Sequence, residues 1–199
     1  MGRALITGAS SGLGKEFAWA LAAEGNDLVL VARSEQRLKE LAEQIELKAG
    51  VHAEVLAADL STGAGVQYVA NRLLSHERPI TLLINNAGGG LGQEFSSGVV
   101  KKEMDAANVM VNAVLVLTHA AVKVMVERGR GTIINVASIA SMTAQGTYSA
   151  HKAWVKTFSE GLASDLEGTG VNVTAVLPGL MHTEFHQRSN VDSSQWPMC

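Results

Sequence analysis

The chain has 199 residues, of which 47% are hydrophobic, and a formal net charge of −3 at neutral pH. A chain of this length and apolar content can bury one sizeable core, and the lack of a basic excess argues against a nucleic-acid partner. The single cysteine, Cys199, cannot form an intrachain disulfide, so we expect a cytoplasmic location.

Apolar, β-branched runs alternate with segments of helical period along the chain. This alternation is typical of an α/β fold with a doubly wound parallel sheet and helices on both faces. We expect one domain over residues 1–187 and a polar tail, loop or disordered, over 188–199. No membrane partner is expected, because polar residues interrupt the most apolar stretch, 106–126. The expected strands lie at 3–7, 27–32, 51–56, 80–84, 131–137 and 171–177, and the expected helices at 12–24, 34–49, 62–76, 100–128 and 147–167.

The first strand runs into a glycine-rich turn, Thr7–Gly14, with the sequence TGASSGLG. Glycine there permits a positive φ and lets a backbone approach a phosphate, while the helix start offers unpaired N–H groups. A phosphate-cleaving P-loop is disfavoured, because Lys15 is followed by Glu16 rather than by a hydroxyl residue. A hydrolase nucleophile at Ser10 is also disfavoured, because too little chain precedes it to supply the oxyanion hole.

Tyr148 and Lys152 lie four residues apart in an expected helix, so their side chains rise from one face. An unperturbed tyrosine, with a pKa near 10, is a poor acid-base catalyst at neutral pH. An ammonium about 4 Å away would favour the phenolate by roughly 4 kcal/mol, or about three pKa units, as an upper limit. The pair therefore predicts acid-base chemistry.

These motifs, with Asp59, Asn85-Asn86-Ala87-Gly88, Ser138 and Pro178-Gly179 in the same order, resemble the short-chain dehydrogenase/reductase family over essentially the whole chain. The resemblance implies a Rossmann-type fold and hydride transfer between a nicotinamide cofactor and a carbonyl or secondary alcohol. It implies Ser138, Tyr148, Lys152 and Asn112 as catalytic residues. The implied cofactor-binding residues are Gly8, Ser10, Ser11, Gly12, Leu13, Gly14, Arg33, Asp59, Leu60, Asn86, Ala87, Gly88, Tyr148, Lys152, Pro178, Gly179 and Thr183.

The end of the second strand selects the cofactor, because the residue there lies beside the adenosine ribose. Ala32 occupies the place where an acidic residue would bind the ribose of NAD, and Arg33 can pair with the 2′-phosphate of NADP. We expect NADP(H) to be preferred, with NAD(H) as the alternative. Asp59 matches the family's adenine-contact position and could also cap the helix that follows it, and the two roles are compatible.

Ser138 closes the fifth strand and matches the family's catalytic serine, with Ser141 as the second candidate. Asn112 matches the family's fourth catalytic residue, where a helix irregularity and a water lead to the lysine. No metal site is expected, because His182 and His186 lack the spacing of a zinc motif and a third ligand.

Family members continue beyond this chain, so the resemblance implies that the last strand and the helices over the substrate pocket are missing. The edge of the sixth strand would then be exposed. A nucleotide-binding sensor or assembly protein without turnover is therefore the alternative to an enzyme. The resemblance also implies a homodimer or homotetramer that associates through the helices carrying Asn112 and Tyr148.

Overall fold

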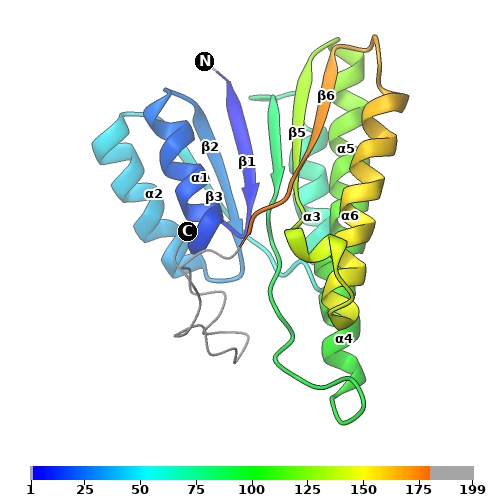
Figure 1. Cartoon of the computed structure of the whole chain (residues 1–199). Coiled ribbons are helices and arrows are strands. Elements are labelled where there is room, and N and C mark those ends of the chain that lie inside the picture. Colours follow the sequence, from blue (N-terminus) through cyan, green and yellow to red (C-terminus); the bar gives the residue numbers. More distant parts are fainter. Residues whose placement is uncertain (1, 180–199) are drawn as a thin grey trace.

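The computed structural model describes residues 2–179 and contains the expected six-stranded parallel sheet, with the strand order β3-β2-β1-β4-β5-β6. The sheet and its helices make an α/β fold of the Rossmann type (Figure 1). The elements are β1 (Arg3–Thr7), α1 (Gly12–Ala23), β2 (Asp27–Ala32), α2 (Glu35–Ala49), β3 (Ala53–Ala57), α3 (Gly63–Leu74), β4 (Leu82–Asn85), α4 (Val100–Ala107), the π-helical segment η1 (Asn108–Asn112), α5 (Ala113–Glu127), β5 (Gly131–Val136), the 3₁₀ turn η2 (Ile139–Met142), α6 (Gly146–Asp165) and β6 (Val171–Val176).

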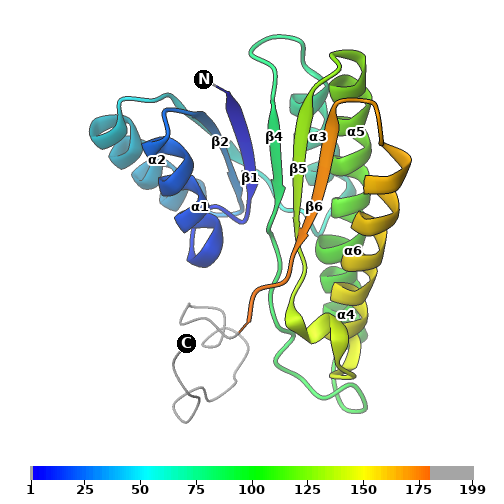
Figure 2. The ribbon, with the colours of Figure 1, turned by 45° about the horizontal axis from the view of Figure 1, so that its top comes forward.

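Helices cover the sheet from both sides, α1 and α2 on one face and α3, α5 and α6 on the other (Figures 1 and 2). Successive strand residues alternate between the two cores, as the two-residue period of a strand requires. Leu5 packs into the core beneath α3 and α5, whereas Ala4 and Ile6 pack into the core beneath α1 and α2. Apolar side chains on both faces of β1 explain why this strand appears in the sequence as a continuous apolar run.

The expected helix at 100–128 is not one regular helix, because the π-helical segment Asn108–Asn112 separates α4 from α5. Its hydrogen bonds join residues five apart, which changes the faces on which the following side chains lie. Residues 100–127 are long and apolar enough to cross a membrane by length and composition alone, but half of their most apolar 18-residue stretch is buried inside the protein. This stretch is covered within the protein where α5 packs on α3.

The carboxyl ends of β1 and β4 meet where the strand order reverses direction. Open α/β sheets bind ligands at such switch points, because the two adjacent loops leave the sheet in opposite directions. The glycine-rich turn follows β1, and residues 86–99, which contain no helix or strand, follow β4. Within the described residues β3 and β6 are the two edge strands of the sheet.

Candidate active site

A cleft of about 1880 Å³ runs along the carboxyl edge of the sheet, and residues that follow all six strands line it. Gly14, a predicted cofactor-binding residue, does not line the cleft and packs against Gly8 instead. Thr183, His182 and His186 lie outside the described residues, and within residues 2–179 no group of three His, Cys, Asp or Glu side chains could hold a metal. The predicted residues that line the cleft are Gly8, Ser10, Ser11, Gly12, Leu13, Arg33, Asp59, Leu60, Asn86, Ala87, Gly88, Ser138, Tyr148, Lys152, Pro178 and Gly179.

The turn between β1 and α1 forms a cradle that only glycine can build. Gly8 and Gly12 have φ values of +69° and +52°. A Cβ at Gly8 would lie 3.0 Å from the Cα of Ala87, and one at Gly14 would lie 2.3 Å from the Gly8 carbonyl oxygen. Ser11, which precedes α1, makes no side-chain cap. The start of α1 therefore presents uncapped N–H groups beside the cleft, an arrangement that attracts phosphate.

Asn86 joins this turn to the end of β4. Its Nδ2 donates to the carbonyl oxygens of Thr7 and Gly8, at 2.9 and 3.4 Å. The backbone N–H groups of Asn86 and Ala87 donate to Thr7 Oγ1 at 2.9 and 3.0 Å, and this hydroxyl donates to the Ile84 carbonyl at 3.3 Å. These bonds connect the two strands at the switch point and fix the floor of the cleft.

Two arginines lie beside the cleft at the end of β2. Arg33 follows the strand and Arg37 lies in the first turn of α2, and both are exposed and line the cleft. Ser34 caps α2 by accepting a hydrogen bond from the backbone N–H of Arg37 at 3.4 Å. Sequence reasoning missed Arg37, although its four-residue spacing from Arg33 across a helix start could have indicated it.

Asp59 organises the turn after β3 and does not cap α3. Its carboxylate accepts hydrogen bonds from the backbone N–H and the hydroxyl of Ser61, at 2.9 and 2.8 Å. These bonds lower the pKa of Asp59, burial opposes them, and the charges of Arg33 and Lys101 lower it further. The cap of α3 is Thr62. Of the two roles considered for Asp59, the helix cap is therefore wrong.

Ser138 and Tyr148 meet at the opposite end of the cleft. Ser138 caps η2, and its Oγ accepts a hydrogen bond from the N–H of Ala140 at 3.1 Å. Burial raises the pKa of Tyr148, and a hydrogen bond with Ser138 opposes this effect. Ser141 does not line the cleft, which leaves Ser138 as the serine beside the tyrosine.

Lys152 is buried below Tyr148, with only 5% of its surface exposed. Its Nζ donates to the Val136 carbonyl at 2.7 Å and lies 5.9 Å from the centre of the Tyr148 ring. Burial lowers the pKa of Lys152 to about 8. The expectation that Lys152 depresses the pKa of Tyr148 therefore differs from the structure, in which burial of the phenol is the larger effect.

The structure does not bring Asn112 into the site. Its side chain is exposed, outside the cleft wall, and Nδ2 donates to Asn108 Oδ1 at 2.8 Å. Met110 lines the cleft instead, and both its Sδ and Lys152 Nζ lie 3.5 Å from where a Cβ on Gly88 would be. The helix irregularity that the resemblance implied at Asn112 is present as the π-helical segment, and this segment places Met110 rather than the side chain of Asn112 in the cleft wall.

A buried polar network anchors α6 to the sheet near Lys152. Asn85 Nδ2 on β4 donates to Asn135 Oδ1 on β5 at 2.9 Å, and to Thr118 Oγ1 on α5 at 3.0 Å. Asn135 Nδ2 donates to Ser159 Oγ on α6 at 2.9 Å. Buried polar groups are costly when left unpaired, so this network fixes the placement of α6 on β5.

Comparison with known proteins agrees with this geometry. A family model for short chain dehydrogenase matches residues 3–194. Sulfoacetaldehyde reductase 2 of Chromohalobacter salexigens is 37% identical over 186 residues, covering 91% of this chain and 73% of that protein. A short-chain dehydrogenase from Sphingobium yanoikuyae in complex with NADPH has a TM-score of 0.96 at 36% identity, covering 100% of this chain and 78% of that one. L-Sorbose reductase from Gluconobacter frateurii, complexed with NADPH and L-sorbose, has a TM-score of 0.86 at 32% identity, and the match covers 98% of this chain and 77% of that one. The chain therefore belongs to the short chain dehydrogenase family of oxidoreductases.

Proposed function

We propose that the chain is an NADP(H)-dependent oxidoreductase that interconverts a carbonyl compound and a secondary alcohol. The observation that carries this proposal is one cleft with a glycine cradle and two arginines towards one end and Ser138, Tyr148 and Lys152 at the other. The NADPH complexes of the Sphingobium and Gluconobacter proteins support the choice of cofactor. NAD(H) is the alternative cofactor.

The residues fit a dinucleotide. Gly8 and Gly14 pack too closely on Ala87 and on each other to carry a Cβ, which keeps the turn tight, and the start of α1 offers N–H groups for a pyrophosphate. Arg33 would pair with a 2′-phosphate, and Asp59 would lie on the adenine side. Asn86 to Gly88, Pro178 and Gly179 would line the rest of the cofactor site. When bound, the cofactor supplies the hydride.

Tyr148 would donate a proton to the oxygen of the substrate carbonyl. Its raised pKa keeps the phenol protonated at neutral pH but also makes it a weak acid, so release of the proton would depend on the nearby ammonium of Lys152. The hydroxyl of Ser138, already bonded to Tyr148, would polarise and orient the same oxygen. Lys152 would hold the cofactor ribose and stabilise the phenolate that remains. The reverse oxidation would use the same groups.

Replacing Arg33 with Ala is expected to weaken NADPH binding by about tenfold to a hundredfold, the equivalent of about 1.5 to 3 kcal/mol for a charged hydrogen bond. NADH binding should change little, because NADH has no 2′-phosphate. Calorimetric titration of both cofactors measures the difference. Arg130→Ala, at an exposed arginine preceding β5, is the control and should leave both affinities unchanged. Equal losses for NADPH and NADH would remove Arg33 from cofactor selection.

The proposed reaction is tested by following NADPH absorbance over a panel of ketones and aldehydes, with cofactor binding measured in parallel. Consumption that depends on a carbonyl substrate supports the proposal. Binding of NADPH without consumption across the panel would favour the alternative of a nucleotide-binding protein without turnover.

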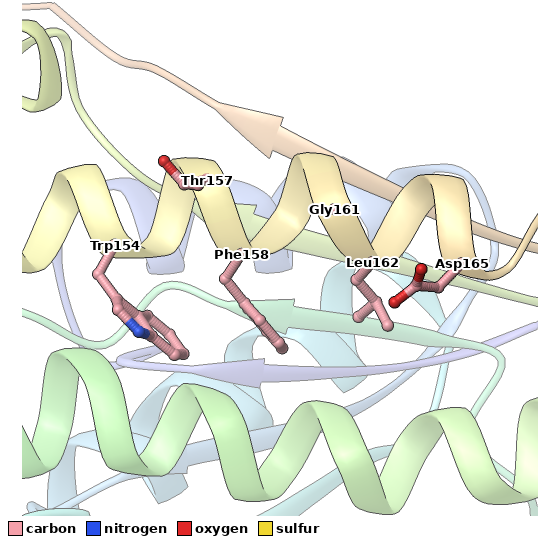
Figure 3. Close-up of a pocket in the computed structure, with 6 residues that line it drawn as sticks. All are labelled: Trp154, Thr157, Phe158, Gly161, Leu162 and Asp165. Atoms are coloured by element: carbon pink, nitrogen blue, oxygen red, sulfur yellow. The ribbon is translucent and has the colours of Figure 1, made fainter.

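We also propose that two copies associate through α5 and α6. α5 exposes Leu115 and Val116. On α6, Trp154 and Phe158 stack with ring centres 4.8 Å apart and line a shallow hollow of about 340 Å³ that contains no predicted catalytic residue (Figure 3). Trp154→Glu should convert the dimer to a monomer in light scattering at micromolar concentration. An unchanged mass for this variant would exclude this surface.

A further inference from the structure

Residues 93–99, called here the 93–99 loop, are closed by the side chain of Gln93. The N–H of Val99 donates to Gln93 Oε1 at 3.0 Å, and Gln93 Nε2 donates to the Val99 carbonyl at 3.2 Å. Gly98 packs directly on this amide, because a Cβ there would lie 2.6 Å from Gln93 Cδ. The loop is therefore a compact unit closed by one side-chain amide, although it contains no helix or strand.

Glu103, on α4, connects the 93–99 loop to α6. One carboxylate oxygen accepts a hydrogen bond from Gln93 Nε2 at 2.8 Å, and the other accepts one from Thr147 Oγ1 at 2.6 Å. The two donors come from segments more than forty residues apart in the chain. A single carboxylate therefore bridges both segments.

Both bridged segments border the catalytic cleft, one through Gln93 and the other through Tyr148. Gln93 itself lines the cleft. Thr147 directly precedes Tyr148 in the first turn of α6, so a bond to Thr147 restrains the turn that carries the proposed proton donor. Glu103 does not line the cleft and is placed to act only through its partners.

The charges around Glu103 favour this bridge. The hydrogen bonds from Thr147 and Gln93 lower the pKa of Glu103, so it is a carboxylate at neutral pH. His151, one turn after Thr147 on the same face of α6, has a pKa lowered by burial and by the charge of Lys152, although Glu103 opposes this. Hydrogen bonds to a charged acceptor are stronger and shorter than neutral ones, which agrees with the distances observed.

We propose that Glu103 is a positioning residue, which ties the 93–99 loop to the first turn of α6 and thereby sets Tyr148 against the wall of the cleft. This role rests on the proposed function insofar as Tyr148 is the proton donor. The tie itself is a property of three side chains and can be measured without turnover.

The test compares Glu103→Ala, Thr147→Val and the double variant with the wild-type chain. Hydrogen-deuterium exchange should be faster in residues 93–99 and in the first turn of α6 for each single variant. The kcat should fall by about tenfold to a hundredfold, with little change in the NADPH dissociation constant, because a small misplacement of a catalytic group costs this much. The double variant should resemble Glu103→Ala, since both changes remove the same bridge. Glu160→Ala, on the exposed face of α6, is the control and should leave exchange and kcat unchanged.

Unchanged hydrogen-deuterium exchange in the 93–99 loop of a folded Glu103→Ala variant would overturn the proposal. So would a double variant whose increase in exchange equals the sum of the increases in Glu103→Ala and Thr147→Val. Should Glu103→Ala fail to fold, Thr147→Val applies the same test from the other end of the bridge. Wild-type chain that turns over no carbonyl compound contradicts the proposed function, whereas the exchange measurements still decide whether the bridge exists.

Discussion

Replacing Tyr148 with Phe is expected to reduce turnover by about a hundredfold to ten-thousandfold, the usual contribution of a positioned general acid. The change removes one hydroxyl and keeps the ring that packs above Lys152. NADPH affinity should stay within about twofold of wild type, because the glycine cradle and Arg33, which would hold the phosphates, are untouched. The loss should therefore appear in kcat.

Steady-state rates on a responsive carbonyl compound, with calorimetric titration of NADPH, measure both quantities. The chain offers a matched control, because Tyr68 is its only other tyrosine and lies 54% exposed on α3. Tyr68→Phe should retain wild-type turnover. A Tyr148→Phe variant that keeps a substantial fraction of kcat would show that another group, or water, supplies the proton.

Replacing Lys152 with Met is expected to stabilise the folded chain at neutral pH while impairing turnover. The folded protein holds the pKa of Lys152 at about 8, below the ordinary value of 10.5, because burial disfavours the ammonium. Below pH 8 Lys152 is protonated in both the folded and the unfolded chain. Burying the ammonium then lowers the free energy of unfolding by about 3 kcal/mol, because the unfolded chain keeps the charge in water. Above pH 10.5 the amine is neutral in both states, and the cost disappears.

Urea unfolding of wild type and Lys152→Met between pH 7 and pH 10 measures this cost. The advantage of the variant should shrink by about 2 kcal/mol or more over that range. The variant lacks the hydrogen bond from Lys152 to Val136 at every pH. This loss lowers the free energy of unfolding of Lys152→Met by a constant amount and does not change how its advantage over wild type varies with pH. Lys123→Met, at an exposed lysine on α5, should show no such trend. A pH-independent difference between wild type and Lys152→Met would mean that Lys152 keeps an ordinary pKa in the folded chain.

Local patterns were sufficient to predict the sheet, the helices and most of the cleft. Strands such as β1 and β2 are apolar on both faces, and a buried strand of this kind is evident from its residues alone. Boundaries were less certain. β3 begins at Ala53 rather than at 51, because Gly50 ends α2 in a left-handed conformation and the N–H of His52 donates to Asp27.

Two features of the site depend on tertiary structure and could not be derived from spacing. The π-helical segment buries Met110 and leaves Asn112 exposed, whereas the family resemblance implied both a helix irregularity here and a catalytic role for Asn112. The pKa of Tyr148 depends on how deeply the phenol is buried, and four-residue spacing to Lys152 carries no information about depth. The bridge through Glu103 joins distant segments and was missed for the same reason.

The most direct test of hydride transfer with proton donation from Tyr148 is isotopic. The chain is incubated with NADPH that carries deuterium at the transferable position and with a carbonyl compound that it consumes, and the product is examined by mass spectrometry. Wild type should give an alcohol with one deuterium on the carbinol carbon, and Tyr148→Phe should give almost none. An alcohol without deuterium, or equal labelled product from both proteins, would contradict the proposed mechanism.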